Sequence, residues 1–235
     1  MQIVPPGYHE RVLIVGENGT GKSELTFMLD LYGNYRKVIY IDHKGDCEPR
    51  GPYTLIKKPE DRWGWNRGRR IVYRPDHGTY WHTDRGFEIV LTRLFHQAVR
   101  AYDHKRKRSR EPFVVVIPEI LLFGPRSQKV IGEMASAARQ YELLLIVETQ
   151  RPRRLPVVVR SEAWRIYAFP LGYEDDELEV IKYAKGRLSL DAFRELEDSI
   201  TKDDAHPFYE LIRRTEEGAR ITVRRCGSLV LPAVA

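Results

Sequence analysis

The sequence has very little cysteine and no long hydrophobic run. Its two cysteines, Cys47 and Cys226, are too few for a disulfide framework and show no metal-ligand spacing, so we expect a reducing compartment. The longest apolar stretch, from Phe113 to Phe123, is interrupted by Pro118 and Glu119 and is too short to cross a bilayer. The sequence therefore predicts a protein that is not itself transmembrane.

A signal-peptide pattern, internal repeats and extended low-complexity segments are also missing. Residues 1–16 have neither a charged start nor a long apolar stretch followed by a cleavage site. A length of 235 residues suits one sizeable α/β core, and we expect residues 1–235 to form a single domain. The net charge of +6 permits contact with a polyanion but does not require it.

What the sequence does contain is a regular alternation of short apolar runs and longer amphipathic segments. This alternation predicts the α/β class, with a mostly parallel sheet covered by helices. The last two apolar runs, 208–214 and 220–225, are expected to pair as a C-terminal hairpin. The other expected strands are 11–15, 37–42, 71–75, 113–117, 143–148 and 164–169, and the expected helices are 22–31, 87–102, 127–141, 175–185 and 189–196.

The segment GENGTGKS, residues 16–23, follows the first expected strand and leads into the first expected helix. It fits the phosphate-loop pattern G-x-x-x-x-G-K-[ST] at every specified position. Its glycines let successive N–H groups point at phosphates, and the helix N-terminus adds partial positive charge. Lys22 is expected to reach the β- and γ-phosphates of ATP, and Ser23 to ligate Mg²⁺. The predicted nucleotide-binding residues are Gly16, Asn18, Gly19, Thr20, Gly21, Lys22, Ser23 and Glu24.

A second motif follows the strand 113–117, where nucleotide hydrolases of this kind usually carry an acidic pair. Glu119 stands in the position of the catalytic glutamate that activates water, although it could merely end a strand. Pro118 stands in the position of the magnesium aspartate, and proline has no side-chain acceptor. Either another acid substitutes, for which Asp42 is the candidate, or Ser23, the phosphates and water suffice.

Four segments in this order resemble the FtsK–HerA superfamily of DNA-pumping P-loop ATPases. They are the phosphate loop, IDHKGD (41–46) with its D-x-K-G, VVVIPE (114–119), and ARQYELLLIVETQRP (138–152) with its A-R and T-Q-R-P elements. The resemblance covers residues 11 to 170, and the tail matches only loosely. It implies a three-layer RecA-like fold and ATP hydrolysis coupled to the movement of double-stranded DNA through a homo-oligomeric ring, a pentamer or hexamer.

The same resemblance assigns roles to two further residues. Gln150 corresponds to the sensor glutamine, whose neutral amide can hold the attacking water or the γ-phosphate. Arg139 lies in the A-R element and would act as an arginine finger in a neighbouring subunit. A helix-surface pair with Glu133 or Glu142 is the alternative for Arg139. The rival fingers are Arg126, Arg151 and Arg153.

The short length narrows the resemblance, because FtsK and HerA motors carry extra domains. A bare motor domain is similar to the genome-packaging ATPases of membrane-containing, tectivirus-like icosahedral viruses. That similarity implies a host cytoplasmic location, virion association as an alternative, and capsid or membrane vertex proteins as partners. A conjugation or plasmid ATPase and a Zot-like phage-assembly ATPase share the core motifs. A slow nucleotide-dependent assembly switch, which Pro118 would favour, and a kinase, for which no acceptor-binding lid is evident, complete the alternatives.

Basic segments supply the candidate DNA contacts. The run HKRKRSR, residues 104–110, is dense in positive charge, and its DNA-binding candidates are Arg106, Lys107 and Arg108. It precedes the central strand, so it is expected at the end of the sheet opposite the nucleotide, where it could equally be a solvated loop. Two other basic segments are RPRR (151–154) and the tryptophan- and arginine-rich segment 63–70.

Overall fold

The computed structural model describes residues 4–60, 69–185, 187–198, 206–214 and 220–226. Their main feature is a nine-stranded sheet in the order β11-β10-β9-β1-β8-β7-β2-β4-β3. The seven strands from β9 to β3 pair in parallel, and β10 and β11 extend the sheet with antiparallel pairings. The strands are β1 Arg11–Val15, β2 Val38–Ile41, β3 Thr54–Ile56, β4 Arg70–Tyr73, β7 Phe113–Ile117, β8 Leu143–Thr149, β9 Arg165–Ala168, β10 Phe208–Arg214 and β11 Arg220–Cys226.

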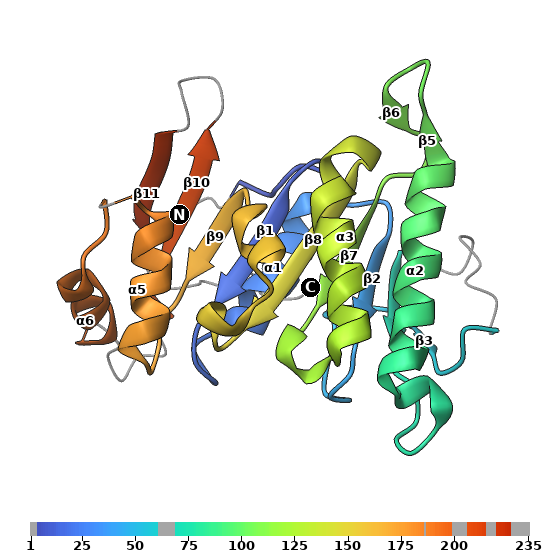
Figure 1. Ribbon diagram of the computed structural model, residues 1–235, viewed down its shortest axis with the longest axis horizontal. Helices are drawn as coiled ribbons and strands as arrows, with labels where there is room; N and C mark the ends of the chain where they lie inside the picture. Colours follow the sequence, from blue (N-terminus) through green and yellow to red (C-terminus); the bar gives the residue numbers. More distant parts are fainter. Residues whose placement is uncertain (1–3, 61–68, 186, 199–205, 215–219, 227–235) are drawn as a thin grey trace.

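Helices cover both faces of this sheet, which gives three layers (Figure 1). α1 packs on one face, and α2 to α6 pack on the other. The central strands are buried along their whole length because both faces are covered, which explains their continuous apolar sequences. The helices are α1 Lys22–Gly33, α2 Asp84–Ala101, α3 Pro125–Tyr141, α4 Val157–Ser161, α5 Glu174–Tyr183 and α6 Leu190–Asp198.

The expected α/β architecture and the C-terminal hairpin are therefore confirmed, with differences in detail. The short edge strand β3 was not among the expected strands, and residues 61–68 of the tryptophan- and arginine-rich segment lie outside the described part. The basic run 104–110 lies mostly in a small β-hairpin, formed by β5 Tyr102–Asp103 and β6 Arg108–Ser109. The Asp103 carboxylate accepts backbone hydrogen bonds from Lys105 (3.0 Å) and Arg106 (3.2 Å), which fixes the turn of this hairpin.

A buried ion cluster ties α1 to the sheet. The Asp30 carboxylate, in α1, accepts hydrogen bonds from Arg70 Nε at 2.5 Å and from the Tyr40 hydroxyl at 2.8 Å. Arg69 reaches the same carboxylate at 3.2 Å. Arg69 and Arg70, which the sequence placed in an aromatic and basic surface, are thus internal partners of α1.

Replacing Asp30 with alanine should destabilise the protein by about 3–5 kcal/mol, because it leaves the buried Arg70 guanidinium without its carboxylate. Urea unfolding measures this change. Asp76→Ala is the matched control, since the Asp76–Lys57 pair is exposed and such pairs contribute about 1 kcal/mol or less. Equal effects of the two substitutions would contradict a role for the Asp30 cluster in stability.

Candidate functional site

The phosphate loop connects β1 to α1 at the carboxyl edge of the parallel strands. Its backbone is anchored on both sides, since Gly16 N–H donates to Thr149 C=O (3.2 Å) and Glu17 N–H donates to Pro170 C=O (3.0 Å). Gly19 and Gly21 adopt φ values of +77° and +98°, a region that glycine enters without steric cost. Gly21 is also the N-cap of α1, so the loop ends where the positive end of the helix dipole begins.

Beside this loop lies a cleft of about 430 Å³. It is formed where the chain leaves β1, β2, β7 and β8, the place at which parallel α/β sheets bind ligands. The predicted site residues that line it are Asn18, Gly19, Gly21, Lys22, Ser23, Glu24, Glu119 and Gln150. Gly16 and Thr20 belong to the same loop, and the Thr20 hydroxyl donates to Glu17 C=O at 2.8 Å.

Lys22 provides the positive charge of the cleft. Its ammonium group donates to the carbonyls of Gly16 (2.8 Å) and Glu17 (2.6 Å), so it lies folded against the loop. Burial lowers the pKa of Lys22, and the carboxylates of Glu148, Glu119 and Glu17 oppose that shift. The ammonium therefore lies within a partly desolvated site that also carries negative charge.

Glu119 and Gln150 approach the loop from β7 and β8. Glu119 has φ 52° and ψ 71°, a left-handed conformation that costs a residue with a Cβ about 1–2 kcal/mol. Its carboxylate accepts a hydrogen bond from the Thr149 hydroxyl at 3.2 Å. The Gln150 amide donates to Asn18 Oδ1 at 2.9 Å, which links the end of β8 to the phosphate loop. Both residues thus line the cleft beside the phosphate loop.

Glu148 is an acid in the cleft that the sequence reasoning missed. Only 4% of this residue is exposed. Its carboxylate accepts hydrogen bonds from the Thr26 hydroxyl (2.6 Å) and the Ser23 hydroxyl (3.2 Å). Burial raises the pKa of Glu148, while the Thr26 hydrogen bond, the charge of Lys22 and the Ser23 hydrogen bond lower it. The signal in the sequence that could have indicated Glu148 is a charged residue at the end of the otherwise apolar segment LLLIVE.

Asp42, the acid expected to help hold Mg²⁺, does not line this cleft. Its buried carboxylate accepts hydrogen bonds from the backbone N–H groups of Gly45 (2.7 Å) and Cys47 (3.1 Å), and from Arg74 Nε (2.6 Å). Asp42 therefore shapes the D-x-K-G loop, which brings Lys44 to the cleft. The place of Asp42 at the end of a neighbouring strand does not by itself specify what its side chain faces, and its part in a magnesium site stays a prediction. The acid beside Ser23 is Glu148.

The protein offers oxygen donors that suit Mg²⁺. The Ser23 hydroxyl and the carboxylates of Glu148 and Glu119 line one cleft, and Mg²⁺ prefers such hard ligands together with phosphate and water. Among the described residues, no group of three or more His, Cys, Asp or Glu side chains could hold a metal.

Arg139 lies far along α3 from this cleft. It is in the last turn of the helix, where it lines a separate hollow with His9, Tyr102 and Lys107, and its guanidinium lies 5.8 Å from the centre of the Trp164 ring. Glu142, one of its suggested partners, instead accepts a hydrogen bond from the backbone of Ser109. The cleft and the A-R element are therefore at opposite ends of α3.

The rival arginines are nearer the cleft edge of the sheet. Arg151 pairs with Asp176 at 2.5 Å and Arg153 pairs with Asp175, so both are engaged within the subunit. Arg126, in the first turn of α3, has an exposed side chain. Its Nη1 atom lies 4.0 Å from Oε2 of Glu88. Arg126 is thus the rival finger with the weakest ion pair.

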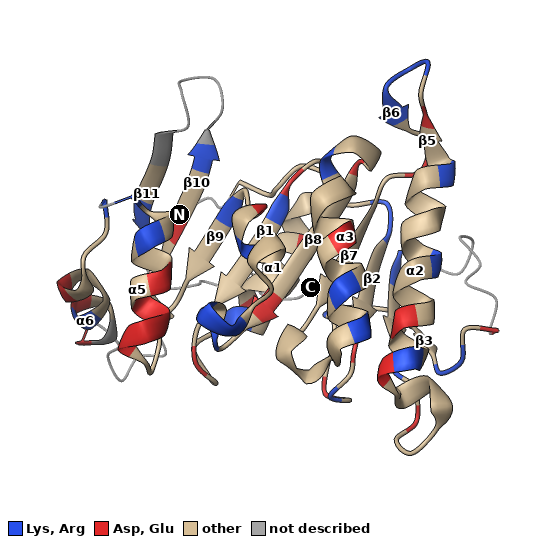
Figure 2. Ribbon diagram, in the orientation of Figure 1, with Lys and Arg blue, Asp and Glu red and all other residues tan. Residues whose placement is uncertain are grey.

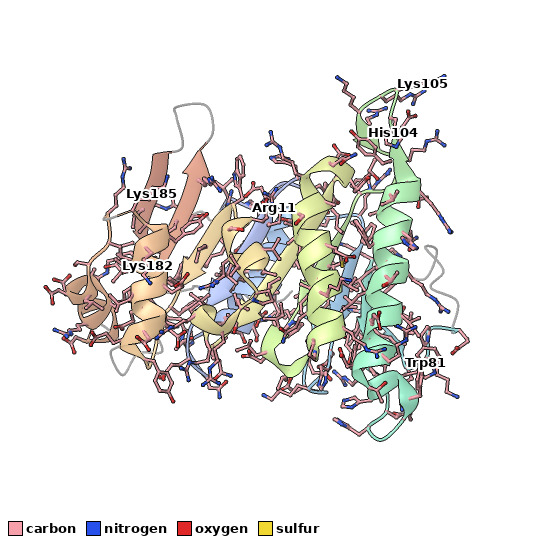
Figure 3. All side chains as sticks on the ribbon, viewed as in Figure 1. Arg11, Trp81, His104, Lys105, Lys182 and Lys185 are labelled. Atoms are coloured by element: carbon pink, nitrogen blue, oxygen red, sulfur yellow. The ribbon has the colours of Figure 1, made fainter. Side chains whose placement is uncertain are left out.

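The β5–β6 hairpin, which carries Arg106, Lys107 and Arg108, precedes β7, whereas the cleft lies beyond the other end of that strand. Figure 2 shows the hairpin projecting from the sheet with its basic residues in blue. All three side chains are exposed. His104 and Lys105 lie in the part of the hairpin that projects from the sheet (Figure 3). The charge of the run is therefore presented away from the sheet.

One further residue, which the sequence did not indicate, lines the cleft. His206, just before β10, also lines the cleft, and a Cβ at Gly21 would lie 2.8 Å from its side chain. Within the described ranges, no helix is both long and apolar enough to cross a membrane.

Comparison with known proteins rests on structure alone. No protein-family model and no curated protein matches the sequence. The genome packaging NTPase B204 of Sulfolobus turreted icosahedral virus 2, solved with ATP-gammaS, matches with a TM-score of 0.61 at 17% identity, over 93% of this chain and 98% of B204. The fold is that of a P-loop ATPase.

Larger ATPases contain the same fold as a part. The pCW3 conjugation coupling protein TcpA matches with a TM-score of 0.56 at 14% identity, over 92% of this chain and 59% of TcpA. The cytoplasmic domain of the Thermomonospora curvata Type VII secretion ATPase EccC gives 0.60 at 13%, over 97% of this chain and 26% of that one. At such identities the likeness concerns the fold, so the chemistry has to be argued from the cleft.

Replacing Lys22 with alanine should weaken nucleotide binding about 10–100-fold, since a hydrogen bond between charged partners contributes about 1.5–3 kcal/mol. Isothermal titration with a non-hydrolysable ATP analogue measures this affinity. Lys182→Ala, a loss of one exposed lysine on α5, is the control and should change nothing. Equal affinities for the parent and Lys22→Ala would place the nucleotide elsewhere.

Proposed function

We propose that this protein is an ATPase that moves double-stranded DNA, and that it packages a viral genome. The cleft carries the proposal, because it brings Lys22, Ser23, Glu119 and Gln150 together at the carboxyl edge of the sheet. The B204 packaging NTPase supports it, since that protein and this chain match over nearly their whole lengths. Residues 1–235 would then act as one motor domain.

Each residue has a physical task in this mechanism. Lys22 and the N–H groups of the loop bind the phosphates, and Ser23 would hold Mg²⁺, which supplies charge that offsets the phosphates when bound. The Glu119 carboxylate accepts the proton of the attacking water. The Gln150 amide, 2.9 Å from Asn18, orients that water or the γ-phosphate without adding charge. The cleft thus has a group for each step of hydrolysis.

A homo-oligomeric ring, a pentamer or hexamer, would place a neighbour's arginine at this cleft. Such fingers contribute roughly 10³–10⁵ in rate. Arg139 remains the candidate from the sequence resemblance, although it lies at the far end of α3 and would have to reach a neighbour's cleft from there. Arg126 is the alternative that the geometry favours, because it is exposed and lies in the first turn of α3.

The partners and location follow from the same proposal. Double-stranded DNA would contact the basic hairpin, and capsid or membrane vertex proteins would hold the ring at the shell. The motor would work in the host cytoplasm or on the virion. A conjugation or plasmid ATPase is the second candidate, supported by the match to TcpA. A slow assembly switch is the third, supported by proline at position 118.

Glu119→Gln should leave nucleotide binding essentially unchanged and lower hydrolysis about 10²–10⁴-fold, because an amide has a similar shape but cannot accept the proton. Binding is measured by titration and turnover by phosphate release. Asp46→Asn is the matched control, since it removes an exposed acid from the same cleft. A parallel loss of binding and hydrolysis in Glu119→Gln would make Glu119 a structural residue.

Duplex DNA should stimulate turnover of the parent protein, and the triple variant Arg106→Ala/Lys107→Ala/Arg108→Ala should lose that response. Each phosphate contact contributes about 0.9 to the slope of log affinity against log salt, so the slope should fall by roughly 2–3. The measurements are phosphate release and DNA binding at several salt concentrations.

A control variant with the same loss of charge replaces Lys182, Lys185 and Arg194, which are all exposed. They lie in α5, just after it, and in α6, at the side of the molecule away from the hairpin (Figure 1). It should respond to DNA like the parent. Slow turnover that DNA does not stimulate in the parent protein would favour the assembly switch. If DNA still stimulates turnover of the triple variant, DNA contacts a surface other than the hairpin.

A further inference from the structure

The magnesium site is short of one acid on β7, and the pairing of β7 with β8 indicates where a substitute can lie. Ile117 pairs with Val147, so Pro118 and Glu148 are the next residues along the two strands. Alternate residues of a strand face the same side of the sheet. Val114 and Val116 of β7 and Leu144 and Ile146 of β8 all pack in the core cluster that contains α1. By this alternation, positions 118 and 148 both face α1.

The contacts of Glu148 agree with that direction. Its Oε2 accepts a hydrogen bond from the Ser23 hydroxyl at 3.2 Å, and its Oε1 accepts one from the Thr26 hydroxyl at 2.6 Å. Ser23 and Thr26 are three residues apart on α1, so they lie on the same side of the helix. The carboxylate therefore spans the first turn of the helix that begins at the phosphate loop.

The hydrogen bond from Ser23 sets the direction of its hydroxyl. A serine hydroxyl has one proton and two lone pairs. When the proton points at Glu148, the lone pairs are free for a cation in the cleft. The negative charge of Glu148 lies behind that oxygen and favours a cation there. Thr26 in turn holds the other oxygen of the carboxylate in place.

We propose that Glu148 is the positioning residue for Mg²⁺ and performs, from β8, the task that an acid at position 118 would perform from β7. This inference rests on the proposed ATPase function. Glu148 acts through Ser23 and through the charge that it brings to the cleft. The alternative is a purely structural link between α1 and β8.

The test measures the affinity of a fluorescent ATP analogue as a function of Mg²⁺ concentration. Glu148→Gln should bind the analogue in EDTA like the parent, because the phosphate loop is unchanged. The Mg²⁺ concentration that produces half of the Mg²⁺-dependent change in affinity should rise about 10–100-fold. This is the usual cost of removing a group that orients a metal ligand. Asp46→Asn is the control, since it removes an acid of the same cleft that pairs with Lys44, and it should cause a much smaller shift.

A second variant supplies the missing acid on the other strand. Pro118→Asp in the Glu148→Gln background should restore most of the Mg²⁺ response, because position 118 faces the same layer. Pro118→Asp alone should lower the Mg²⁺ requirement of the parent. This single variant keeps the proposal testable if Glu148→Gln does not fold, which thermal unfolding of each protein will reveal.

Three outcomes would overturn the proposal. An unchanged Mg²⁺ requirement in Glu148→Gln excludes a role in metal positioning. An equal loss of affinity in EDTA and in Mg²⁺ makes the residue structural. An unchanged Mg²⁺ requirement in Pro118→Asp would contradict the inference, drawn from the strand register, that positions 118 and 148 serve the same magnesium site. A parent protein that binds no nucleotide under any condition would instead refute the proposed function itself.

Discussion

The pairing of β1 with β8 is the interaction on which the candidate site depends. Ile14 lies beside Glu148 and Val15 beside Thr149, so the chain leaves both strands at the same level of the sheet. The phosphate loop continues from β1, and Gly16 is fastened to Thr149 by a backbone hydrogen bond. A shift of one residue in this register would turn Glu148 away from α1, since alternate side chains face opposite sides. The parallel register therefore positions the acids relative to the loop, and burial of both faces holds the register fixed.

The charges of the cleft depend on one another as well as on the fold. Lys22 lies among Glu148, Glu119 and Glu17, and its burial would be costly without these carboxylates. Buried Asp42 and partly buried Arg74 form a second ion pair, which holds the D-x-K-G loop and thereby places Lys44 and Asp46 beside the phosphate loop. Buried charges of this kind are stable only with partners, so the ion pairs around the cleft also maintain its shape.

Local patterns predicted the parts of the site that are local in sequence. The phosphate loop needs only its glycines, Lys22 and Ser23 in fixed spacing between a strand and a helix, and the strands are apolar because both of their faces are buried. Glu148 was missed because its partner Ser23 lies 125 residues away, and no spacing rule joins them. The contacts of Asp42 were equally hard to predict, because its carboxylate turns to the backbone of its own loop. Segment 104–110 was placed at the correct end of the sheet by chain order, but its hairpin depends on Asp103, just outside the basic run.

The cleft and the basic hairpin lie at opposite ends of the same strand, which constrains how they can communicate. The hairpin leads directly into β7, and β7 ends at Pro118 and Glu119. A five-residue strand spans about 17 Å. β7 is paired on both sides and buried throughout, so it transmits a displacement as a rigid element instead of absorbing it. Glu119 follows it in a left-handed conformation that is sterically costly, so a small shift of β7 would alter the position of the Glu119 carboxylate in the cleft. A contact at the hairpin would in this way alter the cleft without any direct approach to it.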